Sequence, residues 1–515
     1  MNVNDDLRNW TGDLGDGRYK NPILYADYSD PDVIRVGDDY YMTASSFTYV
    51  PGLPILHSKD LVNWELINYA AYELTEEYDV PRHGCGVWAP SIRYHDGKYW
   101  IFYGDPDLGV FMTNTEDIYG KWSPLKLIWK GKGIIDTMPL WDDDGRAYLV
   151  HAFAGSRCGF NSRLAVCEME PDGTGMIGLD CCVYMGGEEN HTIEGPKFYK
   201  KDGYYYIMAP AGGVVQGWQV CLRSKNVYGP YEIKTVMRQG DAIFNGPHQG
   251  GWVDTPAGED WFINFQDLGA YGRVIHLNPV KWIDGWPAMG EDIDGDYCGN
   301  PVETYKKPEL PVQPISHIPT SDDFKADKLG LQWQWQANFD ESWYSIGSEE
   351  GRLRLYALKT DGAEGEYLLN RPNVLTQLWR SPVMRITMKV DLSSEKESGA
   401  ALAITGNDYC YIALKNDGTL LQVKGTSELC ENVEENVVES ENIGVSSVWL
   451  RIDVCGEFNS PKARANYSYS KDGKNFEPFG EEFEPTQGKW VGAKTAVFAF
   501  GDEGGYADVS EFCVD

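Results

Sequence analysis

The chain has 515 residues and a formal net charge of −33, with 78 acidic side chains against 45 basic ones. This length exceeds one ordinary hydrophobic core, so we expect two domains. The negative charge repels polyanions, which argues against nucleic acid and anionic membranes as partners.

The first residues and the cysteines indicate the cellular compartment in which the protein is expected. The opening stretch MNVNDDLRNWTGDLG has neither the basic nor the apolar segment of a signal peptide, and no stretch approaches the roughly 18 apolar residues of a membrane helix. The 11 cysteines are scattered, without CxxC spacing or a Cys/His zinc cluster, and are expected to be buried free thiols. We therefore expect a soluble cytoplasmic protein.

Five related segments recur between about residues 20 and 300, spaced 48 to 58 residues apart. In four of them an Asp-Asp or Asp-Gly pair follows eight residues after the start, between two apolar runs, and the fifth has a longer turn. Asp-Gly between apolar runs predicts a tight hairpin, and each repeat leaves room for two more strands. Four strands per repeat predict a propeller blade, so we expect a five-bladed β-propeller. A stack of sandwiches is the alternative, but it does not explain the shared spacing.

The first position of each repeat, which we call position zero, holds a chemically informative residue. In a propeller the innermost strands line the central channel, so residues at one register lie at one height around it. This register predicts that five side chains converge at one mouth: Asp30, Trp88, Asp136, Glu194 and His248.

Three carboxylates in one funnel favour a particular chemistry. Like charges in a partly desolvated site raise one another's pKa, so that one carboxyl keeps a proton while another stays ionised. Hydrolysis of a glycosidic bond needs this division, with a proton donor for the leaving oxygen and a base or nucleophile across the ring. Trp88 offers a face on which a sugar ring stacks. A metal site and chance acidity are the alternatives.

The N-terminal region resembles glycoside hydrolase family 43, the inverting five-bladed propeller glycosidases. The resemblance lies in NPILYADYSDPDVIRVGDDYYMTASSF, VWAPSIRYHDGKYWIFY, IIDTMPLWDDDG, IEGPKFYKKDGYYYI and YGRVIHLNPVKW. It implies that Asp30 is the general base, that Glu194 is the general acid and that Asp136 tunes and orients the acid. It also implies three substrate-binding residues: Arg273 for sugar hydroxyls, and Trp88 and Phe47 as pocket walls.

The resemblance further implies that His248 lies under the site, beside a structural calcium ion or a water molecule. A histidine that is simply packed in the channel is the alternative. No organic cofactor is implied.

Two residues depart from the usual pattern of the family. Asp32 stands where the family usually carries Ser, and Thr137 where it often carries Pro. Neither departure removes a catalytic group, but both are expected to alter the floor of the pocket and therefore the substrate specificity. Asp27 and Asp32 lie off the register of position zero, and we interpret them as a loop residue and as a neighbour further along the strand.

The second half of the chain indicates another β domain. We expect the propeller at residues 1–305, a Pro-rich linker at 306–319 and an antiparallel β-sandwich of jelly-roll or lectin-like type at 320–515. LGLQWQWQ, SYSKDGKNFEPFG and GGYADVSEF resemble the C-terminal sandwich of family 43 xylosidases and arabinofuranosidases, which packs on the propeller and shapes the active-site rim. A carbohydrate-binding module is the alternative.

The expected activity is exo-acting, inverting hydrolysis that releases terminal α-L-arabinofuranosyl or β-D-xylosyl residues from hemicellulose-derived oligosaccharides. The sequence leaves open which sugar is preferred, which linkage is cleaved, and whether the protein is oligomeric. An endo-acting arabinanase and a catalytically silent sugar-binding propeller are the alternatives. A domain beside the mouth argues against the open groove that an endo enzyme needs, and the intact carboxylate set argues against the silent propeller.

Overall fold

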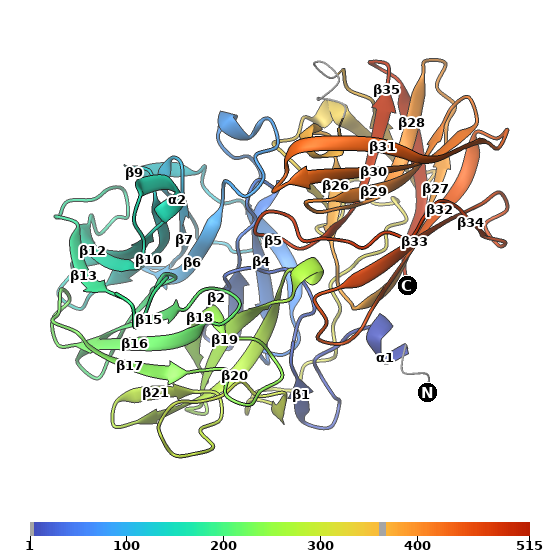
Figure 1. Ribbon diagram of the computed structural model, residues 1–515. Coiled ribbons are helices and arrows are strands. Elements are labelled where there is room, and N and C mark those ends of the chain that lie inside the picture. Colours follow the sequence, from blue (N-terminus) through green and yellow to red (C-terminus); the bar gives the residue numbers. More distant parts are fainter. Residues whose placement is uncertain (1–4, 360–366) are drawn as a thin grey trace.

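The computed structural model describes residues 5–359 and 367–515, and strands dominate them. The two α-helices in this part of the chain are α1 (Asp5–Arg8) and α2 (Gly155–Cys158), with four residues each. Neither approaches the length of a membrane-spanning helix. A β-propeller, drawn from blue to yellow-green in Figure 1, packs beside a β-sandwich drawn from yellow to red. The expected all-β class with a five-bladed propeller and a sandwich is therefore confirmed.

The propeller consists of five four-stranded antiparallel sheets, one for each predicted repeat. Blade one consists of β2 (Asp32–Val36), β3 (Asp39–Thr43), β4 (Gly52–Ser58) and β5 (Glu65–Ala71). Blade two consists of β6 (Trp88–His95), β7 (Lys98–Asp105), β8 (Gly109–Thr115) and β9 (Lys126–Lys130). Blade three consists of β10 (Ile134–Trp141), β11 (Ala147–Phe153), β12 (Arg163–Met169) and β13 (Cys181–Met185). Blade four consists of β14 (Lys197–Lys201), β15 (Tyr204–Ala211), β16 (Trp218–Ser224) and β17 (Glu232–Met237). Blade five consists of β18 (His248–Asp254), β19 (Asp260–Asp267), β20 (Arg273–Ile283) and β21 (Trp286–Met289).

Turn chemistry explains why the first hairpin of a blade forms where it does. In blade two, Asp96 and Gly97 have φ values of 49° and 76°, and in blade four Asp202 and Gly203 have values of 51° and 75°. A two-residue turn with positive φ at both positions matches the twist of the flanking strands. These turns fix the register of the innermost strand and so the position of the residue eight places earlier.

The two ends of the propeller domain are tied together. β1 (Arg18–Lys20) pairs with β22 (Thr304–Lys306), and the Asn21 side chain donates to the carbonyls of Leu277 and Val302 at 2.9 and 2.8 Å. These buried hydrogen bonds join the start of the domain to blade five and to the segment that follows it.

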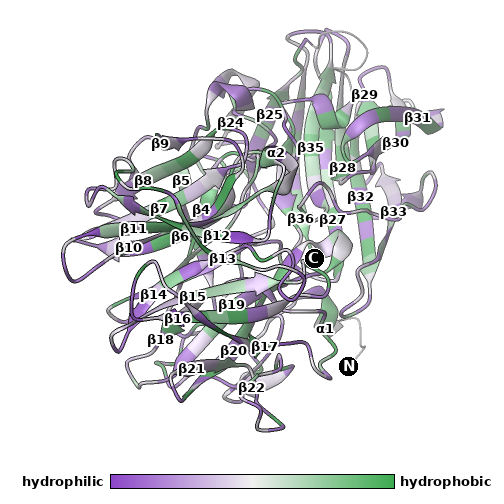
Figure 2. Ribbon diagram, turned by 60° about the vertical axis from the view of Figure 1, so that its left-hand side comes forward, coloured by the Kyte–Doolittle hydropathy of each residue, from purple (hydrophilic) through white to green (hydrophobic). Residues whose placement is uncertain are grey.

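The sandwich consists of two seven-stranded antiparallel sheets. One sheet contains β23 (Gln334–Trp335), β26 (Leu375–Leu378), β35 (Lys494–Gly501), β28 (Ser398–Thr405), β29 (Tyr409–Lys415), β30 (Thr419–Glu428) and β31 (Glu431–Asn442). The other contains β24 (Tyr344–Gly347), β25 (Arg352–Tyr356), β36 (Tyr506–Val514), β27 (Val383–Asp391), β32 (Ser447–Gly456), β33 (Ala463–Ser470) and β34 (Glu477–Pro478). Buried residues alternate with less buried ones along β27 and β32, as expected of strands with one face on a core. Figure 2 shows hydrophobic residues along the strands of both units.

An apolar cluster joins the two units. Tyr271 of the propeller lies against Trp379 of the sandwich, with ring centroids 5.5 Å apart, and its hydroxyl donates to the Pro382 carbonyl at 2.8 Å. Leu7 and Trp10, which the sequence assigns to the propeller domain, pack on the same cluster. The sandwich is therefore held against the loop that precedes β20, the strand that begins at Arg273.

The cysteines are free thiols, as expected, but their burial differs. Cys182, Cys455 and Cys513 are exposed, so the expectation that the thiols are buried is wrong for these three. They lie on strands whose outer faces meet solvent, and sequence spacing alone does not tell which face a strand residue occupies.

Candidate active site

The residues at position zero meet at one end of the propeller channel because the innermost strands are irregular there. The pairing register shifts between Trp88 and Ser91 in β6, between Ile135 and Met138 in β10, and between His248 and Gly250 in β18. Bulges of this kind re-aim side chains and are common beside active sites.

The backbone is also unusual at two of the carboxylates. Asp30 and Asp136 have φ values of 55° and 58°, in the left-handed region that residues other than glycine rarely adopt. Such strained positions concentrate at functional sites, where the surrounding structure holds them. The local backbone thus directs both carboxylates to the channel mouth.

The mouth opens into a pocket of about 100 Å³. All the residues expected to act in catalysis or to bind substrate line it, whereas His248 does not. The lining residues are Asp30, Phe47, Trp88, Ala89, Ile135, Asp136, Glu194, Val214, Gln249, Arg273 and Trp490.

Asp30 is surrounded by hydrogen-bond donors. Its Oδ2 accepts from the hydroxyls of Ser29 and Ser45, both at 2.6 Å. Arg273 Nη1 lies 3.2 and 3.3 Å from its two oxygens. Because every partner donates, the arrangement suits an ionised carboxylate. Arg273, expected to bind sugar hydroxyls, thus also contacts Asp30.

Asp136 of blade three and Glu194, which precedes blade four, form a pair of interacting carboxyl groups that also line the pocket. Asp136 is buried and accepts from the Gly195 amide at 2.7 Å, whereas 27% of the Glu194 side chain is exposed to the pocket. Burial, and then the negative charge of Glu194, raise the pKa of Asp136 to about 8. The coupled pair therefore retains a proton at neutral pH, which is the requirement for proton donation.

Replacing Asp136 by Asn is expected to stabilise the protein while reducing its activity. The carboxyl ionises near its ordinary value of 3.8 in the unfolded chain but keeps its proton to about pH 8 when folded. The stability that the protonated Asp136 carboxyl contributes to the folded state is thus fully present below about pH 4. This contribution is lost as the pH rises to about 8, so the wild type becomes less stable across this window. The melting temperature of Asp136→Asn should exceed that of the wild type by a margin that widens across this window and then levels. A margin independent of pH would contradict the raised pKa.

The sandwich supplies a wall that the sequence did not reveal. Trp490 lies in the loop before β35, with its ring centroid 6.3 Å from that of Trp88 at an interplanar angle of 74°. The Arg273 guanidinium lies 5.8 Å from the Trp490 ring. Phe47 packs beside Trp88 with Tyr49 and Val491. Aromatic rings from both units therefore border the pocket.

Asp27 secures this loop, although the sequence indicated only a loop residue. Its two oxygens accept from the backbone amides of Arg273 in the propeller and Gly492 in the sandwich, each at 2.8 Å. A Cβ on Gly492 would lie 2.6 Å from the Gly272 amide nitrogen, so the close approach of the two backbones requires glycine there. Asp27 thus holds Arg273 and the Trp490 loop in one geometry.

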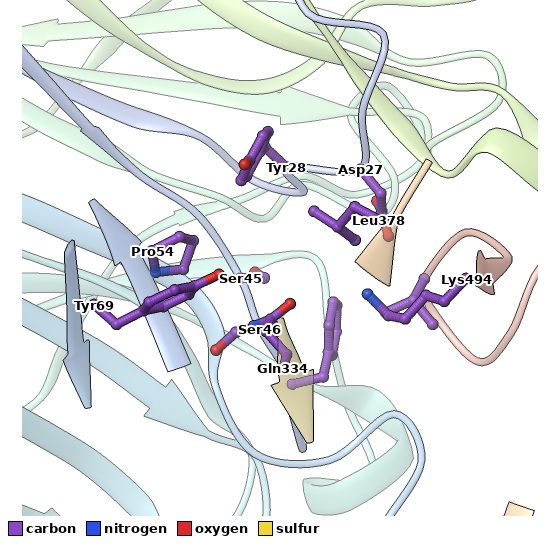
Figure 3. A pocket seen from close by; sticks show the side chains of 11 residues that line it. Asp27, Tyr28, Ser45, Ser46, Pro54, Tyr69, Gln334, Leu378 and Lys494 are labelled. Carbon is purple, nitrogen blue, oxygen red and sulfur yellow. The ribbon is translucent and has the colours of Figure 1, made fainter. Parts of the chain in front are cut away.

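A small cavity of about 20 Å³ lies beside this contact (Figure 3). Asp27 and Lys494 reach it from opposite units, and Ser45, which donates to Asp30, also lines it. Burial raises the pKa of Asp27 and lowers the pKa of Lys494 to about 8, and each shift is opposed by the charge of the other residue. The pair is an internal electrostatic contact between the two units.

His248, the residue expected to lie beside a calcium ion, is buried next to Glu194. Its Nε2 lies 3.3 Å from Glu194 Oε1, and its Nδ1 faces Gly217, where a Cβ would lie 3.0 Å away. Within residues 5–359 and 367–515, the group of acidic or histidine side chains with converging ligand atoms is Asp292, Asp294 and Asp296. These three lie on the partly exposed loop after β21 and not in the channel.

Comparison with known proteins yields consistent matches over both units. The model of glycosyl hydrolases family 43 matches residues 19–287, and that of the beta xylosidase C-terminal concanavalin A-like domain matches residues 321–515. A beta-xylosidase of Formosa agariphila is 34% identical over 98% of this chain and 91% of its own length. A non-reducing end alpha-L-arabinofuranosidase of Bacteroides ovatus is 34% identical over 66% of this chain and 65% of its own length. The crystal structure of a GH43 protein from Bacillus licheniformis superposes with a TM-score of 0.81, at 26% identity over 96% of this chain and 99% of that one.

Proposed function

The chain is a glycosidase that belongs to glycosyl hydrolase family 43, and we propose that it releases single terminal pentose residues from hemicellulose-derived oligosaccharides. The bond cleaved is a β-D-xylosyl or an α-L-arabinofuranosyl linkage at the non-reducing end. Relatives named for each of these activities support the two sugars.

The observation that carries this proposal is the pocket itself. Asp30 lies on one side and the Asp136–Glu194 pair on the other, and Trp490 of the sandwich borders the space between them. An endo enzyme needs a groove through which a polymer passes, whereas this aromatic wall favours a pocket for one terminal ring.

The proposed reaction assigns one task to each carboxyl group. Asp30 accepts a proton from a water molecule that attacks the anomeric carbon. Glu194, the more exposed member of the protonated pair, donates a proton to the departing oxygen. Asp136 shares the proton that its own burial and the charge of Glu194 keep in the pair at neutral pH. Both bond changes occur in one displacement, so the anomeric configuration inverts.

Side-by-side assays of 4-nitrophenyl β-D-xyloside and 4-nitrophenyl α-L-arabinofuranoside test this proposal. Release of nitrophenol from at least one substrate, and of single pentoses from the corresponding oligosaccharides, is expected. Sugar binding without turnover would support the silent propeller instead. Internal cleavage of debranched arabinan into mixed oligosaccharides would support the endo-acting alternative.

A further inference from the structure

A second polar layer crosses the propeller channel beneath the pocket. Asp32 comes from blade one, Arg93 from blade two, Met138 from blade three and Lys197 from blade four. Arg93 Nη1 lies 2.7 Å from Asp32 Oδ2, and Arg93 Nη2 lies 2.7 Å from Met138 Sδ. Blade five presents Gly251, where a Cβ would lie 2.9 Å from Asp32 Oδ1. All five blades therefore shape this layer.

Lys197 is the most unusual member of the layer. It is 2% exposed, and its Nζ donates to the Pro90 carbonyl at 3.4 Å and lies 3.8 Å from Asp32 Oδ1. That oxygen has no hydrogen-bond partner in the described part of the chain. An ammonium group is rarely buried to this degree unless its charge is compensated.

The charges in this layer do not balance. Asp32 contributes one negative charge, and Arg93 and Lys197 contribute two positive charges. Burial lowers the pKa of Lys197, and the negative charges of Asp32, Asp136 and Asp30 oppose this shift, so the neighbouring carboxylates favour the ammonium. A divalent cation on the same axis would be repelled by the ammonium and the guanidinium.

We propose that the ammonium group of Lys197 acts as a permanent cation in the channel. Lys197 is then a positioning residue, which supplies beneath Asp30 and Asp136 the positive charge that a bound metal ion would otherwise supply. This inference rests on the proposed function, because it assigns Lys197 to the support of the proposed catalytic carboxylates. It also gives the departure at Asp32 a role, because its carboxylate pairs with Arg93 at 2.7 Å and lies 3.8 Å from Lys197. The enzyme accordingly needs no metal ion in the channel.

The first test treats the wild-type protein with exhaustive chelation. Metal content, melting temperature and hydrolysis of nitrophenyl pentosides are then measured. We expect no stoichiometric metal beforehand and no change in melting temperature or rate afterwards. A loss that Ca²⁺ restores would overturn the inference. Metal content and melting temperature need no turnover, so they judge this inference even if the proposed substrates are wrong.

The second test compares Lys197→Met with Lys200→Met. Both residues lie on β14, but Lys200 pairs with Asp142 and Asp143 away from the channel. The charged groups that face Lys197 are Asp30 and Asp32 of blade one, Arg93 of blade two and Asp136 of blade three.

Loss of the ammonium removes a positive charge that favours the ionised forms of the facing carboxylates. We expect the acid limb of the kcat/KM profile to move up by about one pH unit in Lys197→Met and to stay in place in Lys200→Met. An unmoved limb in Lys197→Met would overturn the inference, whatever the change in rate. Should Lys197→Met fail to fold, the chelation test still decides.

Discussion

Glu194→Ala is expected to reduce hydrolysis of xylo- or arabino-oligosaccharides by about 10²–10⁴-fold, the usual contribution of a general acid. The departing sugar oxygen of these substrates is strongly basic, so it must receive a proton as the bond breaks. A dinitrophenolate leaves readily without a proton. The same substitution should therefore reduce hydrolysis of a dinitrophenyl pentoside by less than about tenfold.

The measurement is kcat/KM for Glu194→Ala and the wild type on a series of aryl pentosides of decreasing leaving-group pKa. Glu188→Ala is a matched control, because it removes an exposed carboxylate six residues earlier on the same loop. The control should follow the wild type across the series. Equal losses for Glu194→Ala on good and poor leaving groups would remove Glu194 from the role of proton donor.

The sequence predicted the propeller well because its signal is local. Asp-Gly turns such as Asp96-Gly97 require a backbone that few other residues adopt, and they set the register of the strand before them. Register then predicts which residues share a height around the channel. Asp30, Asp136 and Glu194 meet in one pocket for this reason.

The remaining features depend on contacts between distant segments. Trp490 reaches the pocket from a loop of the sandwich, and Asp27 holds that loop through the amides of Arg273 and Gly492. Nothing in the local sequence of Trp490 distinguishes it from a surface residue. Likewise, Lys197 belongs to a motif that the resemblance identified, but its role depends on Asp32 and Arg93 of other blades. Such pairings follow from the assembled channel and not from any repeat alone.

The second prediction concerns Asp30, whose replacement by Ala is expected to reduce the rate by about 10²–10⁴-fold on every substrate. Water must be activated whichever group departs, so dinitrophenyl pentosides and oligosaccharides should lose the same factor. Asp38→Ala is the matched control, since Asp38 lies exposed in the turn of the same hairpin. A loss that depends on the leaving group would assign Asp30 to proton donation instead.

The stereochemistry of the wild-type reaction provides the decisive measurement of Asp30's role. Asp30 precedes blade one and Glu194 precedes blade four, so the pocket lies between the two carboxyl groups. Inverting pairs are separated by roughly 6.5–9.5 Å, which leaves room for the attacking water, whereas retaining pairs lie about 5–5.5 Å apart. Proton NMR of early product should therefore show the released pentose in the anomeric form opposite to that of the substrate. Release with the original configuration would mean that Asp30 attacks the sugar directly, because two displacements restore the starting geometry.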